Sequence, residues 1–282
     1  MPNSPDASGD AVNRLGLALI GAAMVVGAGA PSLAAELTKA QEAEAIRFAI
    51  NNDIFTLQHE IGHLLVGEFE LPVLGREEDA ADSFASVSLI ERQTDEADQV
   101  LIDSADGWDL SDAASDNPTY EDADFYDEHS LDIQRAYQTV CFMVGAAPDV
   151  FGEVADAYGI DADRQESCGD DYTQAATSWN GLLAPHLRAG GKGASITVRY
   201  EPADKTHAEA AKWLEDAKIL ETAASWVEAT YALPRDLTFT AKLCDEENAF
   251  YSYDERGITF CYEMTQFLYD LDKQDLLHPA AN

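Results

Sequence analysis

The feature that most constrains this chain is the pattern His-Glu-Ile-Gly-His at residues 59 to 63. It lies in a stretch whose apolar residues recur with helical spacing, which predicts a helix. Residues four apart lie one above the other on a helix, so His59 and His63 can present their imidazoles to one metal ion. Glu60 cannot join them as a ligand, but it can stand beside a water on that ion and accept its proton. The pattern therefore predicts a zinc site with Glu60 as general base.

A second motif, Glu-Asp-Ala-Ala-Asp at residues 78 to 82, opens the next expected helix. Glu78 would be the third protein ligand, and three ligands with an open position are the pattern of catalytic zinc. Asp82, one turn further on, can accept the second N–H of a ligating histidine and fix its tautomer. Ala81 is small enough to keep the two helices close. Two plainer interpretations stay open: the histidine motif could be a chance match, and the acidic residues could merely face solvent.

The charge of the chain limits its partners. It has 53 acidic and 17 basic residues, a net charge of −36. Nucleic acid is excluded as a partner, because neutralising phosphates requires clustered Lys and Arg. A strongly solvated surface explains the acidity, and no loop has the spacing of a calcium-binding loop. The sequence does not indicate the oligomeric state.

The first residues predict a secretory signal peptide, residues 1–34. An apolar run from Leu15 to Ala30 is shorter than the ~20 residues of a membrane-spanning helix, and small residues suit cleavage after Ala34. The alternative is an uncleaved anchor, because acidic residues precede the run. With no second apolar run, the mature protein is expected to lack a stable membrane span. We therefore expect an exported protein, periplasmic or secreted.

The rest of the chain predicts an α+β fold that is predominantly helical. Helices are expected over 36–66 with a break at 51–53, then over 77–90, 127–143, 148–158, 172–187, 206–231 and 263–271. Strands are expected over 195–200, 238–244 and 258–262. The acidic stretch 91–128 lacks sustained periodicity and is expected to be a long, partly mobile loop. We expect a single domain over 35–282, with a candidate internal boundary near 190–194, where glycines cluster.

Four cysteines fit export, because disulfides persist outside the reducing cytoplasm. Three pairings are possible. A hairpin of the last two predicted strands would place Cys244 opposite Cys261, within disulfide reach. We therefore favour Cys141 with Cys168 and Cys244 with Cys261.

The two motifs together resemble those of the gluzincin metallopeptidases, including the CAAX-processing and HtpX-like proteases and the bacterial neutral zinc metallopeptidases. The segments HEIGH, LPVLGREEDAAD, DEHSLDIQR, APHL and NAFY…ITFCYE more closely resemble a bacterial family of exported metallopeptidases catalogued as a domain of unknown function. That resemblance covers nearly the whole mature chain. It implies a zincin-like core with Zn²⁺ as cofactor, and a small antiparallel sheet or hairpin supplied by the C-terminal part.

Two further positions are carried over from this resemblance. Asn248 and Ala249 resemble the start of the edge strand that gluzincins place beside zinc, where its main chain pairs with an extended peptide. In those proteins the strand precedes the histidine helix, so here the order is permuted; the plainer reading of Asn248 is a turn residue. His129 resembles a histidine of the neutral zinc metallopeptidases and could donate to the oxyanion, or could be a helix-start residue with a structural partner. Arg135 is expected to pair with a carboxylate within the fold.

The function expected from these patterns is zinc-dependent hydrolysis of peptide bonds in a peptide or protein substrate. A rival from another class is a non-catalytic exported protein that binds zinc or a partner on a peptidase scaffold. Glu60 favours the enzyme, because a purely structural metal site needs no base there. A zinc hydrolase of another amide is a third reading, against which the edge strand argues.

Overall fold

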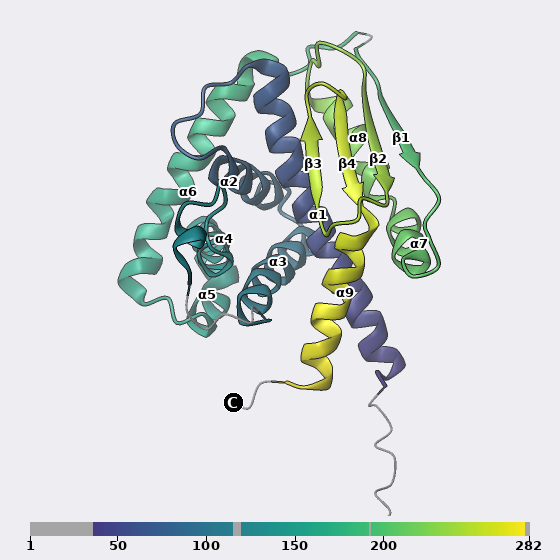
Figure 1. Ribbon diagram of the computed structural model, residues 1–282. Coiled ribbons are helices and arrows are strands. Elements are labelled where there is room, and N and C mark those ends of the chain that lie inside the picture. Colours follow the sequence, from purple (N-terminus) through teal and green to yellow (C-terminus); the bar gives the residue numbers. More distant parts are fainter. Residues whose placement is uncertain (1–35, 115–119, 192, 280–282) are drawn as a thin grey trace, which may run out of the picture. The chain divides into compact units, whose positions relative to one another are not determined.

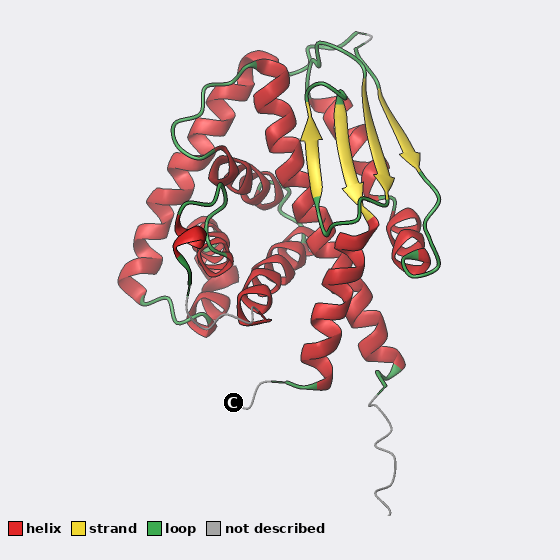
Figure 2. Cartoon of the chain, viewed as in Figure 1, coloured by secondary structure: helices red, strands yellow, loops and turns green. Residues whose placement is uncertain are grey.

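The computed structural model describes residues 36–114, 120–191 and 193–279, and it combines helices with one small sheet (Figures 1 and 2). The predicted signal peptide, residues 1–34, lies outside the described residues. The α-helices are α1 Lys39–Phe69, α2 Glu77–Ile90, α3 Asp95–Ala114, α4 Asp132–Ala146, α5 Pro148–Ala157, α6 Ala162–Leu183, α7 Ala208–Ala217, α8 Ile219–Thr230 and α9 Tyr262–Leu277. The strands are β1 Ile196–Tyr200, β2 Leu237–Lys242, β3 Ala249–Ser252 and β4 Gly257–Cys261, and the short 3-10 helices are η1 Asp122–Phe125 and η2 Ala184–His186. The predicted α+β class, predominantly helical, is confirmed.

Helix α1 runs without interruption, so the break predicted at residues 51–53 is wrong. Asn and Asp are poor helix formers because their side chains compete for nearby backbone groups. Here those side chains have partners on other helices. Asn52 donates to the carbonyl of Asp103 on α3 at 3.0 Å, and Asp53 accepts from the hydroxyl of Thr265 on α9 at 2.7 Å. These tertiary hydrogen bonds outweigh the local propensity.

Most of the stretch predicted as an acidic loop is helix α3, so that prediction is wrong for residues 95–114. Val100, Leu101 and Ala105 are buried at helical spacing and pack with residues of α4 and α5. A few apolar residues on one face are enough to dock a helix, even when its other faces are acidic. The helical spacing of these apolar residues was missed in the sequence because most of the surrounding residues are acidic.

The predicted long helix over 206–231 is two helices, α7 and α8, separated by Lys218 with a left-handed φ of 54°. Leu214 and Leu220 are both fully buried in one core cluster. On a straight helix of about 100° per residue, side chains six positions apart point roughly 120° apart. The turn at Lys218 lets both enter the same core.

The sheet has the strand order β1-β2-β4-β3, with β3 at an edge beside α1 (Figure 1). β1 pairs with β2 and β2 with β4 in parallel, and only β3 pairs with β4 in antiparallel. The expected antiparallel sheet is therefore a mixed sheet, antiparallel only in its last hairpin. The chain reverses at residues 243–248, so β3, and not β2, is the hairpin partner of β4.

Both expected disulfides are present. Cys141 and Cys168 join α4 to α6, and Cys244 and Cys261 join the segment after β2 to the end of β4. The argument from a hairpin of β2 and β4 was nevertheless wrong. Cys261 lies beside Lys242 of β2 in a parallel pair, and Cys244 follows two residues later. Among the described residues, no helix is both long and apolar enough to cross a bilayer.

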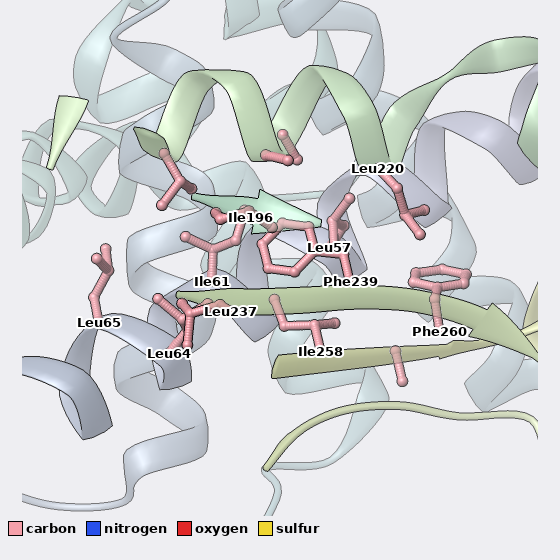
Figure 3. Packing of buried hydrophobic residues seen from close by; sticks show 14 of the residues in the cluster. Leu57, Ile61, Leu64, Leu65, Ile196, Leu220, Leu237, Phe239, Ile258 and Phe260 are labelled. Carbon is pink, nitrogen blue, oxygen red and sulfur yellow. The ribbon is translucent and has the colours of Figure 1, made fainter. Parts of the chain in front are cut away.

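One face of α1 is packed in the main hydrophobic core (Figure 3). Leu57, Ile61 and Leu64 are almost completely buried in one cluster with Phe239 of β2 and Phe260 of β4. Burying a side chain of this size contributes ~1.5–3 kcal/mol. The rotation of α1 about its axis is fixed by this packing, and with it the direction of the polar residues on the other side of the helix.

We predict that Asp53→Asn stabilises the protein, and more so at higher pH. Asp53 is fully buried, and its Oδ1 has no hydrogen-bond partner among the described residues. Burial raises the pKa of this carboxyl from 3.8 to about 8, against the lowering effect of the Thr265 hydrogen bond. A folded pKa above the unfolded one means that stability is present below pH 3.8 and is lost as pH rises to about 8.

Urea unfolding of both proteins at about pH 5 and about pH 8 measures this effect. The stability gained by Asp53→Asn should be larger at the higher pH by at least ~1 kcal/mol. The exposed Asp163→Asn serves as control and should show no such growth. An equal gain at both pH values would contradict the prediction.

Candidate metal centre

Three predicted ligands converge between α1 and α2. His59 and His63, on the polar side of α1, have their Nε2 atoms 3.1 Å apart. Oε2 of Glu78, in the first turn of α2, lies 3.0 Å from Nε2 of His59 and 3.1 Å from Nε2 of His63. Two imidazole nitrogens and one carboxylate oxygen therefore surround one point.

Small residues bring the two helices together. A Cβ added to Gly62, inside the histidine motif, would lie only 3.0 Å from Cα of Ala81 on α2. The backbones approach at this point because neither residue has a larger side chain. This is the role that the sequence predicted for Ala81.

His59 is fixed, on the side away from Glu78, by a chain of partly buried groups. Its Nδ1 lies 2.7 Å from Oδ1 of Asp82. Arg135 donates to both oxygens of Asp82 at 2.7 and 2.8 Å, and its guanidinium carbon lies 3.6 Å from the centre of the Trp108 ring. Burial opposes ionisation, but Arg135 and His59 hold the pKa of Asp82 well below its usual range. Asp82 is therefore an acceptor for Nδ1–H, which leaves Nε2 of His59 directed at Glu78.

His63 has a different support. Its Nδ1 lies 2.9 Å from Oε1 of Glu77, whose side chain is 48% exposed. The two histidines therefore present the same nitrogen, Nε2, to the centre. Nδ1 of His59 is held by a partly buried carboxylate and Nδ1 of His63 by a solvated one. The role of Glu77 was missed from the sequence, where the motif considered begins at Glu78.

His129 approaches the centre from the segment that precedes α4. Its Nε2 lies 3.0 Å from the same Oε2 of Glu78, and its side chain is 47% exposed. Arg76 donates to its carbonyl at 3.1 Å, and Ser130 donates to Asp79 of α2 at 2.7 Å. These contacts attach the segment to the start of α2.

The histidines dominate the electrostatics of Glu78. Burial raises its pKa, but hydrogen bonds from His129, His59 and His63 outweigh this and hold the pKa of Glu78 far below its usual range. The pKa of His59 is raised to about 9, because Asp82 and Glu78 outweigh the lowering effect of burial. Zinc binds neutral imidazole, so raised histidine pKa values make metal binding compete with protons and depend on pH.

Glu60 lies beside these ligands without pointing at their common centre. Its Oε1 is 3.9 Å from Nε2 of His59, and its Oε2 accepts from the backbone N–H of Tyr251 on β3 at 2.8 Å. Burial raises the pKa of Glu60 above the ordinary value for a glutamate. A free carboxylate with a raised pKa next to a metal centre can act as a general base.

The centre opens into a cavity of about 390 Å³. Its lining includes the apolar side chains of Phe55, Trp108 and Met264 and the residues predicted from the edge-strand motif, Asn248 and Ala249. The histidines and glutamates that line it are His59, His63, His129, Glu60, Glu77, Glu78 and Glu128. The structure thus brings every predicted site residue except Asp82 into one cavity, and Asp82 contacts His59 from behind. Trp108 was missed because its segment was expected to be a loop.

The donor set fits zinc, which takes imidazole nitrogen and carboxylate oxygen in sites with three protein ligands. Among the described residues, His59 and Glu78 also form a group of close donors with His129, which could hold a metal ion. Another group, formed by Cys244, Cys261 and Glu263, does not qualify. Its cysteines are joined in a disulfide, and Glu263 accepts the backbone N–H groups of Cys244 and Asp245.

Two histidines one turn apart, an acid from the next helix and a glutamate beside them are the pattern typical of metallopeptidase centres. The chain belongs to a metallopeptidase family: the profile of the family described as "Putative metallopeptidase" matches residues 28–183 and 200–276. The family resemblance read from the motifs is thereby confirmed. Compared with curated proteins and with solved structures, the chain has no match in either set.

We predict that Asp82→Asn weakens zinc binding about ten- to a hundredfold, because it removes the carboxylate that orients His59. Competition with a chromophoric chelator near neutral pH measures the affinity. Glu77→Gln is the matched control on His63 and should have a smaller effect, since Glu77 is half exposed. Circular dichroism checks that Asp82→Asn still folds with Arg135 unpaired. Unchanged zinc affinity in a folded Asp82→Asn protein would show that Asp82 is only a helix acid.

Proposed function

We propose that this protein is a zinc-dependent peptidase that hydrolyses peptide bonds with Glu60 as the general base. The observation that carries the proposal is the convergence of His59, His63 and Glu78 on one point beside a buried, uncoordinated carboxylate. His59, His63 and Glu78 would hold the metal. When bound, zinc supplies a Lewis acid for the carbonyl and lowers the pKa of its water toward ~7.

Glu60 would take the proton from the attacking water and deliver it to the leaving amine. Two features of this chain prepare it for that role. Burial raises its pKa toward the operating range of a base, and the Tyr251 N–H fixes its carboxylate in one orientation. His129, close to Glu78 on the exposed side of the centre, would donate to the oxyanion that develops on the carbonyl oxygen.

The edge strand supports a peptide substrate. Just before β3, the carbonyl of Asn248 accepts from the N–H of Cys261 on β4, whereas the N–H of Tyr251 in β3 points the other way, to Glu60. Because backbone groups alternate in direction along an antiparallel strand, the carbonyl groups of Ala249 and Tyr251 point away from β4, toward the side of the metal centre. An extended peptide could pair with them by strand addition. The Asn248 side chain accepts the N–H of Ala249 at 2.8 Å, so it shapes the start of the strand.

The cavity supports an apolar side chain near the cleaved bond. Its volume of about 390 Å³ and its lining by Phe55, Trp108 and Met264 suit an aliphatic or aromatic residue. We further propose that the protein acts after export, periplasmic or secreted, with peptides or proteins and not nucleic acids as partners. Its two disulfides and its net charge of −36 support this proposal.

We predict that Glu60→Gln binds zinc but loses turnover by at least about a hundredfold, because an amide of the same shape cannot accept the proton. The measurement is digestion of a random peptide library by the zinc-loaded, disulfide-bonded protein, with mass spectrometry of the products and metal analysis of both proteins. Glu166→Gln, which changes an exposed glutamate of α6 that does not line the cavity, is the control and should keep turnover.

The outcome of this experiment separates the proposal from its rival. A wild-type protein that holds one zinc and cuts no peptide would favour a non-catalytic zinc- or partner-binding protein. A Glu60→Gln variant as active as the wild type would refute the assignment of the base. Loss of zinc from Glu60→Gln would show that Glu60 is a ligand instead.

A further inference from the structure

Tyr251 of β3 is held by α1 at both ends. Its backbone N–H donates to Oε2 of Glu60 at 2.8 Å, and its hydroxyl donates to Oε1 of Glu68 at 2.8 Å. Glu60 and Glu68 are eight residues apart on the helix, a rise of ~12 Å. One tyrosine therefore bridges from the metal centre to the last turn of α1.

Glu68 is itself anchored. Its side chain is 1% exposed, and Arg235 donates to it from Nε at 2.9 Å and from Nη2 at 2.7 Å. Arg235 also donates to the carbonyl of Tyr253 at 3.0 Å and lies 4.1 Å from the centre of the Tyr253 ring. A buried carboxylate that receives a two-pronged guanidinium and a hydroxyl is a rigid acceptor. The same arginine ties the end of α1 to the turn after β3.

Gly67 makes room for this contact. A Cβ at this position would lie 2.8 Å from Cε1 of Tyr251, so the ring lies directly on the helix backbone. The helix was expected to end at residue 66, just before Gly67, but α1 continues to Phe69 and includes Gly67. Its lack of a side chain serves the tyrosine instead.

We propose that Glu68 and Arg235 are positioning residues, which clamp Tyr251 and thereby fix the edge strand β3 and the Glu60 carboxylate beside the metal centre. This inference rests on the proposed function and deepens it. Neither residue lies in the metal-site cavity. They act through Tyr251, whose main chain orients the base and whose strand offers its free edge to substrate. Loss of the clamp should therefore affect both catalysis and substrate binding while the metal ligands stay in place.

Tyr251→Phe tests the clamp by removing only the hydroxyl. Tyr253→Phe is the matched control: it lies on the same hairpin, and its hydroxyl makes no hydrogen bond among the described residues. The first measurement is amide hydrogen exchange, followed by mass spectrometry, in the full disulfide-bonded protein with and without zinc. We expect exchange in the peptide covering β3 to become about tenfold faster in Tyr251→Phe, with β2, α2 and α4 unchanged. Tyr253→Phe should exchange as the wild type does.

The second measurement is steady-state cleavage of a peptide that the wild type cuts. We expect Tyr251→Phe to lower kcat/KM about tenfold, through a higher KM and a lower kcat together, because small displacements of catalytic groups are costly. Zinc content should remain one per chain. Gly67→Ala gives an independent arm: alanine is the better helix former, so thermal stability should not fall, yet kcat/KM should, because the added Cβ displaces the ring.

Two results would overturn the inference: unchanged exchange in β3 of Tyr251→Phe, or wild-type kcat and KM in both Tyr251→Phe and Gly67→Ala. Faster exchange throughout the molecule would also overturn it, because that is general destabilisation and not a local clamp. If the proposed function is wrong, the wild type itself cleaves no peptide. The hydrogen-exchange result still tests the clamp in that case.

Discussion

The site depends on the packing of helix α1, which is apolar on one face and polar on the other. Leu57, Ile61 and Leu64 are buried with the sheet, and this fixes the rotation of the helix. The intervening positions, His59 and His63, are then directed to the opposite side, where α2 crosses at Gly62. A shift of one residue in the apolar pattern would turn both imidazoles away from Glu78.

The charged groups at the centre form a series of oppositely charged neighbours. Three histidines contact Glu78, His59 contacts Asp82, and Asp82 is held by Arg135. Each ionised acid has a cationic or hydrogen-bonding partner, which is the condition for burying charge at an acceptable cost. Glu60 differs from them, because its only hydrogen bond among the described residues comes from a backbone N–H, and burial raises its pKa. In the proposed function, Glu78 is the carboxylate that binds the metal and Glu60 is the one that accepts the proton.

Part of this structure could be predicted from short-range patterns in the sequence. The spacing of His59 and His63 and the acids that open the next helix are patterns of neighbouring residues on single helices. The predicted contact of Asp82 with a ligating histidine could therefore be reached by counting turns, but not which histidine it holds. Even Arg135 was expected to pair with a carboxylate, as it does. Helix α3 was missed because its acidic surface outweighed a short apolar stripe, and the break at residues 51–53 was expected because hydrogen bonds from Asn52 to α3 cannot be seen locally. The parallel pairing of β2 with β4 and the clamp on Tyr251 join residues far apart in the chain, which no short-range pattern encodes.

The central claim is that one divalent ion is held by His59, His63 and Glu78. Anomalous diffraction at the zinc edge, from crystals of the zinc-loaded protein, tests it most directly. The account predicts a single strong peak bonded to Nε2 of both histidines and to the Glu78 carboxylate, with Glu60 beside it and not bonded. A peak elsewhere in the molecule, or a zinc ion bound without Glu78, would contradict it.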